Sequence, residues 1–252
     1  MNFRRIFILF LPLLLAEFGA SAQKNLELPG VRPSETVVYH TGHTLSYNPV
    51  WLLPEWVAYE LRAEELEGDA VRARYFSPDP MLEKYPRAEH WHYTHSGWVR
   101  GHMAPAGDMK YDQDAMNDSF YTSNVCPMNQ TFNNSIWKRL EEKVRKWAVQ
   151  FGRVYIITGP VMGDNVGGKV GESDILVPDK FFKAVLVPHG DSFLGIGFIM
   201  DNAETTQGKL RDFAVTINEL EKLTGLNMFA SLNMVTAAKI EKQLPLKELG
   251  LY

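Results

Sequence analysis

The sequence predicts an α+β fold in which helices flank a central antiparallel sheet. Segments with strand-like and helix-like patterns follow one another without the regular alternation that is typical of a parallel α/β sheet. One long segment in the middle of the chain has apolar residues at helical spacing. With 252 residues, 45% of them hydrophobic, the chain is long enough to bury one sizeable core.

The first 22 residues are expected to stand apart from this core. Arg4 and Arg5 precede an apolar run over residues 6–16, and the small residues 20–22 have the pattern of a cleavage site. The run is short for a membrane span. We therefore expect residues 1–22 to be a cleaved signal peptide, with export to the periplasm or the medium and no stable membrane association afterwards. An uncleaved membrane tether is the alternative.

The expected mature chain begins with a segment rich in Pro, Gly and Tyr. We expect residues 23–54 to form an extended N-terminal arm and residues 55–252 to form a single domain. Strands are predicted at residues 56–61 and 71–75, on either side of an acidic loop.

The middle of the chain contains two short extended pieces and the clearest helix. The extended pieces are predicted at residues 98–103 and 119–125, and the helix at residues 134–150. The apolar positions at helical spacing are Trp137, Leu140, Val144, Trp147 and Ala148, with Phe151 just beyond.

Three strands and two helices complete the prediction. The strands are expected at residues 154–158, 182–187 and 193–200, and the helices at residues 215–223 and 234–242. A Gly-rich loop joins the first two of these strands, but it lacks the spacing of a phosphate-binding P-loop.

Charge and cysteine content limit the classes of function. Loss of a signal peptide that carries two arginines and one glutamate would lower the net charge from −4 to −5. Proteins that bind nucleic acid without specificity usually have a broad basic surface, so a nucleic-acid site here requires a local cluster of Arg and Lys in a cleft. Cys126 is the only cysteine, which excludes an intramolecular disulfide, and its uncharged neighbours predict a small buried residue.

The run Arg100-Gly101-His102 is the richest candidate for chemistry. A histidine with a pKa near neutral can accept a proton from an attacking water. Arg100 would point to the same side of a regular strand as His102, where it could hold a phosphate oxygen. Taken alone, the tripeptide favours a structural surface histidine.

A second group of polar residues lies along the predicted helix. Asn133, Trp137, Glu141 and Arg145 follow one another at intervals of four, and each such step turns only about 40° around a helix. An amide, a carboxylate and a guanidinium would therefore face one cleft. A solvated Glu–Arg pair is the alternative interpretation.

Three ordered blocks resemble the DNA/RNA non-specific endonucleases of the ββα-metal type. Residues 99–105 (Val-Arg-Gly-His-Met-Ala-Pro) match the Asp-Arg-Gly-His block of that family, and residues 120–127 match its Phe-Tyr-x-Ser-Asn-Val-x-Pro block. The Asn-x-x-x-Trp-x-x-Leu-Glu-x-x-x-Arg block follows in register over residues 133–145, and the resemblance covers roughly residues 55–232. It implies a ββα-metal active-site motif and an endonuclease that hydrolyses DNA and RNA with little sequence specificity.

The resemblance assigns a general base and a metal site. His102 would activate the attacking water. Asn133 would bind one divalent metal directly, and Glu141 would hold the metal through water. The metal would be Mg²⁺, with Mn²⁺ or Ca²⁺ as alternatives.

The resemblance also assigns the residues that surround the phosphate. Arg100 and Arg145 would bind the phosphate and stabilise its developing charge, while Asn124 would orient the same polar cluster. Arg72 would be a further phosphate-binding arginine, with Arg74 as a competitor for that role. Members of this family commonly form dimers, so a homodimer is an option.

Two positions depart from the family pattern. Val99 replaces the usual Asp before Arg-Gly-His, and Met128 replaces a Gln, with Gln130 nearby. These departures leave open a catalytically weakened or inactive relative that only binds nucleic acid.

A cluster of histidines suggests a zinc-dependent hydrolase as another alternative. The segment lacks the H-E-x-x-H pattern of a zinc-binding helix and is interrupted by proline and glycine. The four histidines are His90, His92, His95 and His102.

Overall fold

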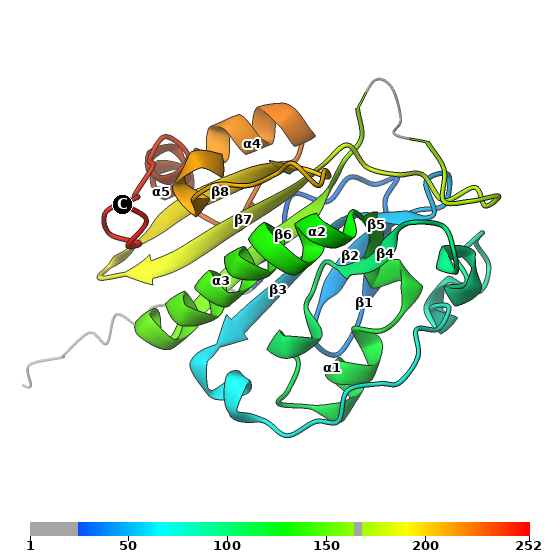
Figure 1. The fold of residues 1–252 in the computed structure, drawn as a ribbon. Helices are drawn as coiled ribbons and strands as arrows, with labels where there is room; N and C mark the ends of the chain where they lie inside the picture. The colour runs from blue at the N-terminus through cyan, green and yellow to red at the C-terminus, as the bar shows by residue number, and fades with distance from the viewer. Residues whose placement is uncertain (1–24, 164–167) are drawn as a thin grey trace, which may run out of the picture.

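A computed structural model of the chain describes residues 25–163 and 168–252; the predicted signal peptide lies outside these residues. Seven strands form one sheet, in the order β1-β2-β3-β6-β7-β8-β9, and every neighbouring pair is antiparallel (Figure 1). The strands of this sheet are β1 (Thr36–Tyr39), β2 (Thr44–Asn48), β3 (Leu53–Arg62), β6 (Arg153–Val161), β7 (Lys180–His189), β8 (Ser192–Asp201) and β9 (Ala214–Val215).

Helices cover both faces of the sheet, as the α+β prediction requires. The long helix α3 (Lys138–Phe151) packs on one face, and α4 (Ile217–Thr224) and α5 (Met234–Ile240) pack on the other. Side chains along β7 alternate between the two cores, because successive residues of a strand point to opposite faces. Phe181 packs in the core under α3, whereas Phe182 packs in the core under α4 and α5.

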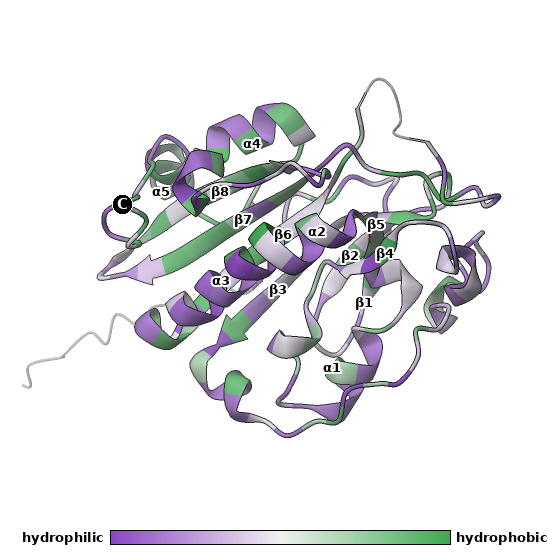
Figure 2. Ribbon diagram, in the orientation of Figure 1, coloured by the Kyte–Doolittle hydropathy of each residue, from purple (hydrophilic) through white to green (hydrophobic). Residues whose placement is uncertain are grey.

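Burial of one face fixes the position of α3. Trp147 and Leu140 are completely buried against the sheet, and full burial of such a side chain contributes about 1.5–3 kcal/mol. An ion pair on the helix surface contributes only about 0.2–0.5 kcal/mol, so packing rather than surface charge holds α3 in place. Figure 2 shows the outward side of α3 as mainly hydrophilic and β7 as mainly hydrophobic.

A small second sheet and the long helical run form the expected ββα motif. Strand β4 (Val99–His102) pairs antiparallel with β5 (Val125–Met128), and His102 lies opposite Val125. The chain then enters one continuous helical run, which Asn129 caps by accepting a hydrogen bond from the Phe132 amide at 3.1 Å. The run consists of α2 (Gln130–Phe132), a π-helical turn η6 (Asn133–Trp137) and α3.

The remaining helical turns lie in the connections. They are η1 (Ala63–Glu67), η2 (Pro80–Leu82), η3 (His90–Tyr93), η4 (Ala106–Asp108), α1 (Gln113–Asp118), η5 (Thr122–Asn124) and η7 (Leu210–Phe213). Across residues 25–163 and 168–252, no helix is long and apolar enough to cross a membrane.

Three local predictions are corrected by the structure. Residues 71–75 form no strand, because the side chain of Gln113 takes both main-chain hydrogen bonds of Val71, at 2.8 Å each. Residues 119–125 do not form the predicted extended piece. They contain the turn η5, and strand pairing with β4 begins only at Val125. Residues 36–48, expected within an extended arm, contain two strands of the central sheet: β1 at its edge and β2 between β1 and β3.

Candidate active site

A cleft of about 490 Å³ lies beside the first half of the helical run and the loop that follows β4. Five of the predicted site residues line it, although they come from three separate stretches of chain. They are Arg72, His102, Asn133, Glu141 and Arg145.

His102 lies at the end of β4, with its ring against two aromatic side chains. The ring centroid is 5.2 Å from that of Phe76 and 5.1 Å from that of Phe120. Burial, together with the nearby charge of Arg72, lowers the pKa of His102 to about 3. The imidazole is therefore neutral near pH 7, and its buried Nε2 has no hydrogen-bond partner among the described residues.

Glycine is required beside this histidine. Gly101 is buried and lies opposite Cys126 in the β4–β5 pair. A Cβ added at Gly101 would lie 2.1 Å from the sulfur of Met128, closer than packed atoms allow. Cys126 is itself completely buried, which confirms the interpretation of that cysteine as a small core residue.

Asn124 does not line the cleft but clamps the chain just after His102. Its Oδ1 accepts a hydrogen bond from the Ala104 amide, and its Nδ2 donates to the carbonyls of Ala104 and Ser119, each at 2.9 Å. The side chain is fully buried, and its polar atoms are engaged in these three bonds. Asn124 is therefore a positioning residue for the loop that follows His102.

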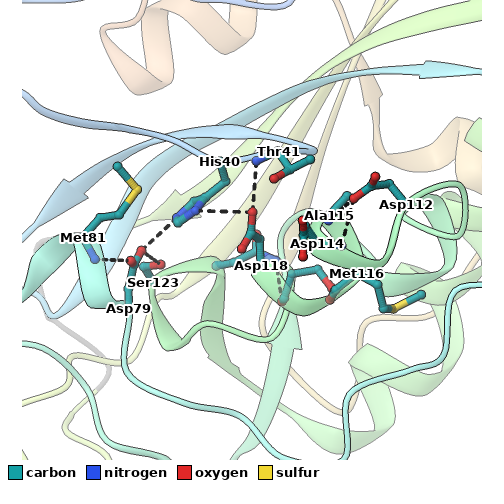
Figure 3. Close-up of polar contacts among 12 residues, drawn as sticks. His40, Thr41, Asp79, Met81, Asp112, Asp114, Ala115, Met116, Asp118 and Ser123 are labelled. Carbon is teal, nitrogen blue, oxygen red and sulfur yellow. Dashed lines mark hydrogen bonds and ion pairs between the residues drawn. The ribbon is translucent and has the colours of Figure 1, made fainter.

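The turn that carries Asn124 is held from behind by Asp79. The Ser123 hydroxyl donates to Asp79 at 2.6 Å, the Met81 amide donates at 2.9 Å, and His40 Nε2 lies 2.9 Å from the same carboxylate (Figure 3). Burial alone would raise the pKa of Asp79, but the hydrogen bonds from His40 and Ser123 outweigh burial and lower it. Asp79 thus stays ionised and joins the end of β1, η2 and η5.

On the helical side of the cleft, Asn133 begins the π-helical turn. A π-turn widens the helix locally and is frequent at functional sites. Glu141 follows on α3 and lines the same cleft. An amide oxygen and a carboxylate are hard oxygen donors of the kind that suit Mg²⁺, which retains several waters. The two side chains therefore fit the divalent ion that the sequence resemblance implies.

Arg145 is held in the cleft by a buried carboxylate. Its Nε donates to Asp108 Oδ1 at 2.6 Å, and its Nη2 lies 3.6 Å from Glu141 Oε2. The second oxygen of Asp108 accepts a hydrogen bond from the Tyr59 hydroxyl at 2.9 Å. A Cβ added at Gly107 would lie 2.9 Å from Arg145 Nη2, so a residue without a side chain makes room for the guanidinium.

A buried lysine lies beneath the same helix. Lys183 on β7 is completely buried, and its Nζ lies 4.8 Å from the ring centroid of Trp137. No other described residue hydrogen-bonds to this ammonium group. Burial lowers the pKa of Lys183 and raises the pKa of Glu141, whose carboxylate the nearby charge of Lys183 helps to keep ionised.

Asp108 and Lys183 were missed as site residues by the sequence analysis. The sequence did contain a signal for Lys183, because this lysine lies inside a hydrophobic strand. It shares one face of that strand with Phe181 and Val185, which both belong to the core under α3. No comparable signal marked Asp108, because its partner Arg145 is 37 residues away in the sequence.

Arg100 lies away from the cleft lining. Its Nη2 donates to the carbonyl of His90, and its guanidinium lies over the rings of Tyr93 and Phe76, at 5.1 and 5.6 Å. Of the two candidates in the segment before β4, Arg72 lines the cleft, whereas Arg74 lies over the Tyr75 ring at 5.2 Å.

The histidines at residues 90–102 do not form a zinc site. His92 Nδ1 accepts a hydrogen bond from the Glu89 amide at 3.0 Å. Within the described ranges, no three side chains of His, Cys, Asp or Glu are arranged to hold a metal ion. The described residues therefore provide no ligand group of the kind that the zinc-dependent alternative requires.

Comparison with known proteins adds a family match and close relatives. Residues 24–234 match the family described as DNA/RNA non-specific endonuclease. The chain is 36% identical over 208 residues to the mitochondrial nuclease EXOG of Danio rerio, covering 77% of this chain and 61% of that protein. It is 32% identical over 211 residues to the mitochondrial endonuclease G of Bos taurus, covering 79% of this chain and 70% of that protein.

A solved structure has the same fold. The chain resembles a protein in the crystal structure of the EndoG/EndoGI complex with a TM-score of 0.73 and 28% identity. The likeness covers 84% of this chain and 91% of that one. The fold is thus shared over most of both chains.

Proposed function

The chain belongs to the DNA/RNA non-specific endonuclease family, and from that premise we propose that it is a metal-dependent nuclease that hydrolyses phosphodiester bonds of DNA and RNA. One observation carries the proposal. His102, neutral and with a free ring nitrogen, lines the same cleft as Asn133, Glu141 and Arg145.

A divalent ion, most simply Mg²⁺, would supply Lewis acidity toward the phosphate oxygens and the leaving oxygen. Asn133 would bind it directly and Glu141 through water. This pair leaves most of the coordination sphere to water, which suits an ion that gives up its hydration shell reluctantly.

The side chains of the protein accept the proton and bind the phosphate. His102 takes a proton from the attacking water, a step that contributes typically about 10²–10⁴-fold in rate. Arg145, fixed through Nε by Asp108, directs its terminal amino groups to the phosphate. Arg72 contributes a second cation at the cleft. Because these groups meet phosphate rather than base edges, the sequence preference is weak.

Cleavage of plasmid DNA and of RNA, with Mg²⁺ or with EDTA, tests the proposal. We expect the wild-type chain to cut both polymers with Mg²⁺ and neither with EDTA. If both polymers stay intact under every metal condition, the chain is not a nuclease.

Val99 motivates a second candidate, a relative that binds nucleic acid without cutting it. Val99 packs against the apolar core and lies opposite Met128 in the β4–β5 pair, where the family pattern has an Asp. This candidate predicts that an oligonucleotide is retained in EDTA and stays uncut with Mg²⁺. Efficient cleavage by the wild-type chain would exclude it.

Export through a cleaved signal peptide is also proposed, on the strength of residues 1–22. Expression of the full chain followed by N-terminal sequencing tests it. A secreted or periplasmic product that begins at Gln23 is expected, and an uncleaved product in the membrane fraction would contradict it.

A further inference from the structure

A second cavity, of about 450 Å³, lies outside the catalytic cleft, between residues 91–96 and the loop at residues 171–173. Its volume is in the range of small-ligand pockets. Trp91 lines this pocket and is 59% exposed, although tryptophan side chains are largely buried on average. The catalytic proposal leaves Trp91 without a role.

Trp91 is held in place by contacts of the residues on both sides of it. The His92 ring makes a T-shaped contact with the indole, with ring centroids 4.0 Å apart, and the Glu89 amide donates a hydrogen bond to His92 at 3.0 Å. The carbonyl of His90 accepts a hydrogen bond from Arg100. A ring that is already ordered loses little conformational freedom when a ligand binds, so Trp91 is suited to be a binding surface.

The chemistry of this pocket fits a nucleobase better than a phosphate. None of its described lining residues is Lys or Arg, and Glu172 adds a carboxylate that would repel an anion. The lining combines an aromatic side chain with polar groups, among them the exposed side chains of Thr94 and His95. A base has an aromatic face for stacking and donors and acceptors along its edge, which match this combination.

The pocket adjoins the side of β4 that carries the proposed catalytic base. Phe76 bridges Arg100 and His102, because the guanidinium carbon lies 5.6 Å and the imidazole centroid 5.2 Å from the centroid of its ring. The same guanidinium binds the carbonyl of the residue before Trp91. A single strand that is bound with one phosphate at His102 can therefore bring a base a few nucleotides away to Trp91.

We propose that Trp91 stacks on an unpaired base of the substrate strand, a few nucleotides from the bond that is cut. This inference rests on the proposed function for the position of the strand. In a duplex the bases are paired and stacked on one another, so the site acts on single-stranded DNA or RNA. Every base has a face that can stack, so the site adds affinity for single strands without adding a strong sequence preference.

The first test measures binding in EDTA, where no cutting is expected. Two single-stranded oligonucleotides of equal length are compared, one with all its bases and one in which abasic sugars replace the nucleosides, so that the phosphates are the same. The variants are Trp91→Ala and Trp91→Phe, which keeps an aromatic face. Tyr252→Ala is the control, because Tyr252 is an exposed aromatic residue outside this pocket.

Trp91→Ala should bind the strand with bases about tenfold more weakly than the wild type does, which is a typical effect of losing one stacking ring. It should bind the abasic strand like the wild type. Trp91→Phe should recover most of the lost affinity, and Tyr252→Ala should match the wild type on both strands. Unchanged affinity of Trp91→Ala for the strand with bases would overturn the proposal. Equal losses on the two strands would also overturn it, because Trp91 would then act on the backbone or on the fold.

A second test compares cleavage of a single strand and of a blunt-ended duplex of the same sequence, with Mg²⁺. Trp91→Ala should raise the KM for the single strand about tenfold, leave its kcat unchanged and leave both constants for the duplex unchanged. Equal impairment on the two substrates would overturn the proposal. A wild-type chain that shows the expected binding but never cuts would refute the nuclease function and leave the base site intact. Cleavage without base-dependent binding would do the reverse.

Discussion

Replacement of Asn124 by alanine tests whether the loop after His102 is held by one buried amide. The change removes three buried hydrogen bonds of 2.9 Å each. A hydrogen bond contributes about 1 kcal/mol, and an amide N–H left unpaired in the interior costs about 1–3 kcal/mol. We therefore expect Asn124→Ala to lower the free energy of unfolding by at least about 3 kcal/mol. For a chain of this size, that corresponds to a fall in Tm of about 6–12 °C.

Urea unfolding followed by circular dichroism measures this loss, and Asn117→Ala provides the matched control. Asn117 is exposed and accepts one surface hydrogen bond, from Gln113 at 3.0 Å, so its replacement should cost less than about 0.5 kcal/mol. At a temperature where Asn124→Ala is folded, kcat should fall by about 10²-fold because a 1 Å displacement near the reacting atoms has that effect. A loss of stability below 1 kcal/mol would refute the clamp.

Four further predictions follow from the charges around the cleft. Because burial and the charge of Arg72 lower the pKa of His102, Arg72→Met should raise that pKa in an NMR titration, and an unchanged value would contradict the assignment. The same lowered pKa means that the unfolded chain takes up this proton first, so stability should decline as the pH falls below about 6.5, and His102→Ala should lessen the decline. Asp108→Asn should release Arg145 and raise the KM for an oligonucleotide about tenfold or more. It should also lower the free energy of unfolding by about 1–3 kcal/mol. A wild-type KM would show that the ion pair between Asp108 and Arg145 is dispensable. Lys183→Met should leave stability unchanged or higher, because it removes a buried charge that has no hydrogen bond. The same variant should bind Mg²⁺ more weakly in calorimetry at neutral pH, because Lys183 helps to keep the Glu141 carboxylate ionised. Tighter Mg²⁺ binding would contradict this role of Lys183.

The parts of the fold that the sequence predicted are those with strong periodicity. The helix around Trp137 and Trp147 has one continuous apolar stripe, and the strands β6, β7 and β8 are long runs of Val, Ile and Phe buried on both faces. By contrast, β1 and β2 have only four and five residues. They belong to the sheet because neighbouring strands pair with them, and such long-range pairing leaves little trace in the local sequence.

The candidate site was predicted in its residue types but not in its contacts. His102, Asn133 and Glu141 were expected in one cleft, and they line it together. Arg100 was expected beside His102 in that cleft, but the carbonyl of His90 and the rings of Tyr93 and Phe76 hold its guanidinium elsewhere. Strand alternation correctly predicted that Arg100 and His102 share one side of β4, since both side chains pack against Phe76. It did not predict which neighbouring groups would bind the guanidinium.

The role of His102 as the base is the central claim of the account. The most direct test is the single-turnover cleavage rate of His102→Ala on an oligonucleotide, together with its Mg²⁺ affinity. Since Asn133 and Glu141 lie on the helical run and not on β4, Mg²⁺ should bind to this variant as it does to the wild type, while the rate falls by about 10²–10⁴-fold. A rate within a few-fold of the wild type, with metal bound, would contradict the account.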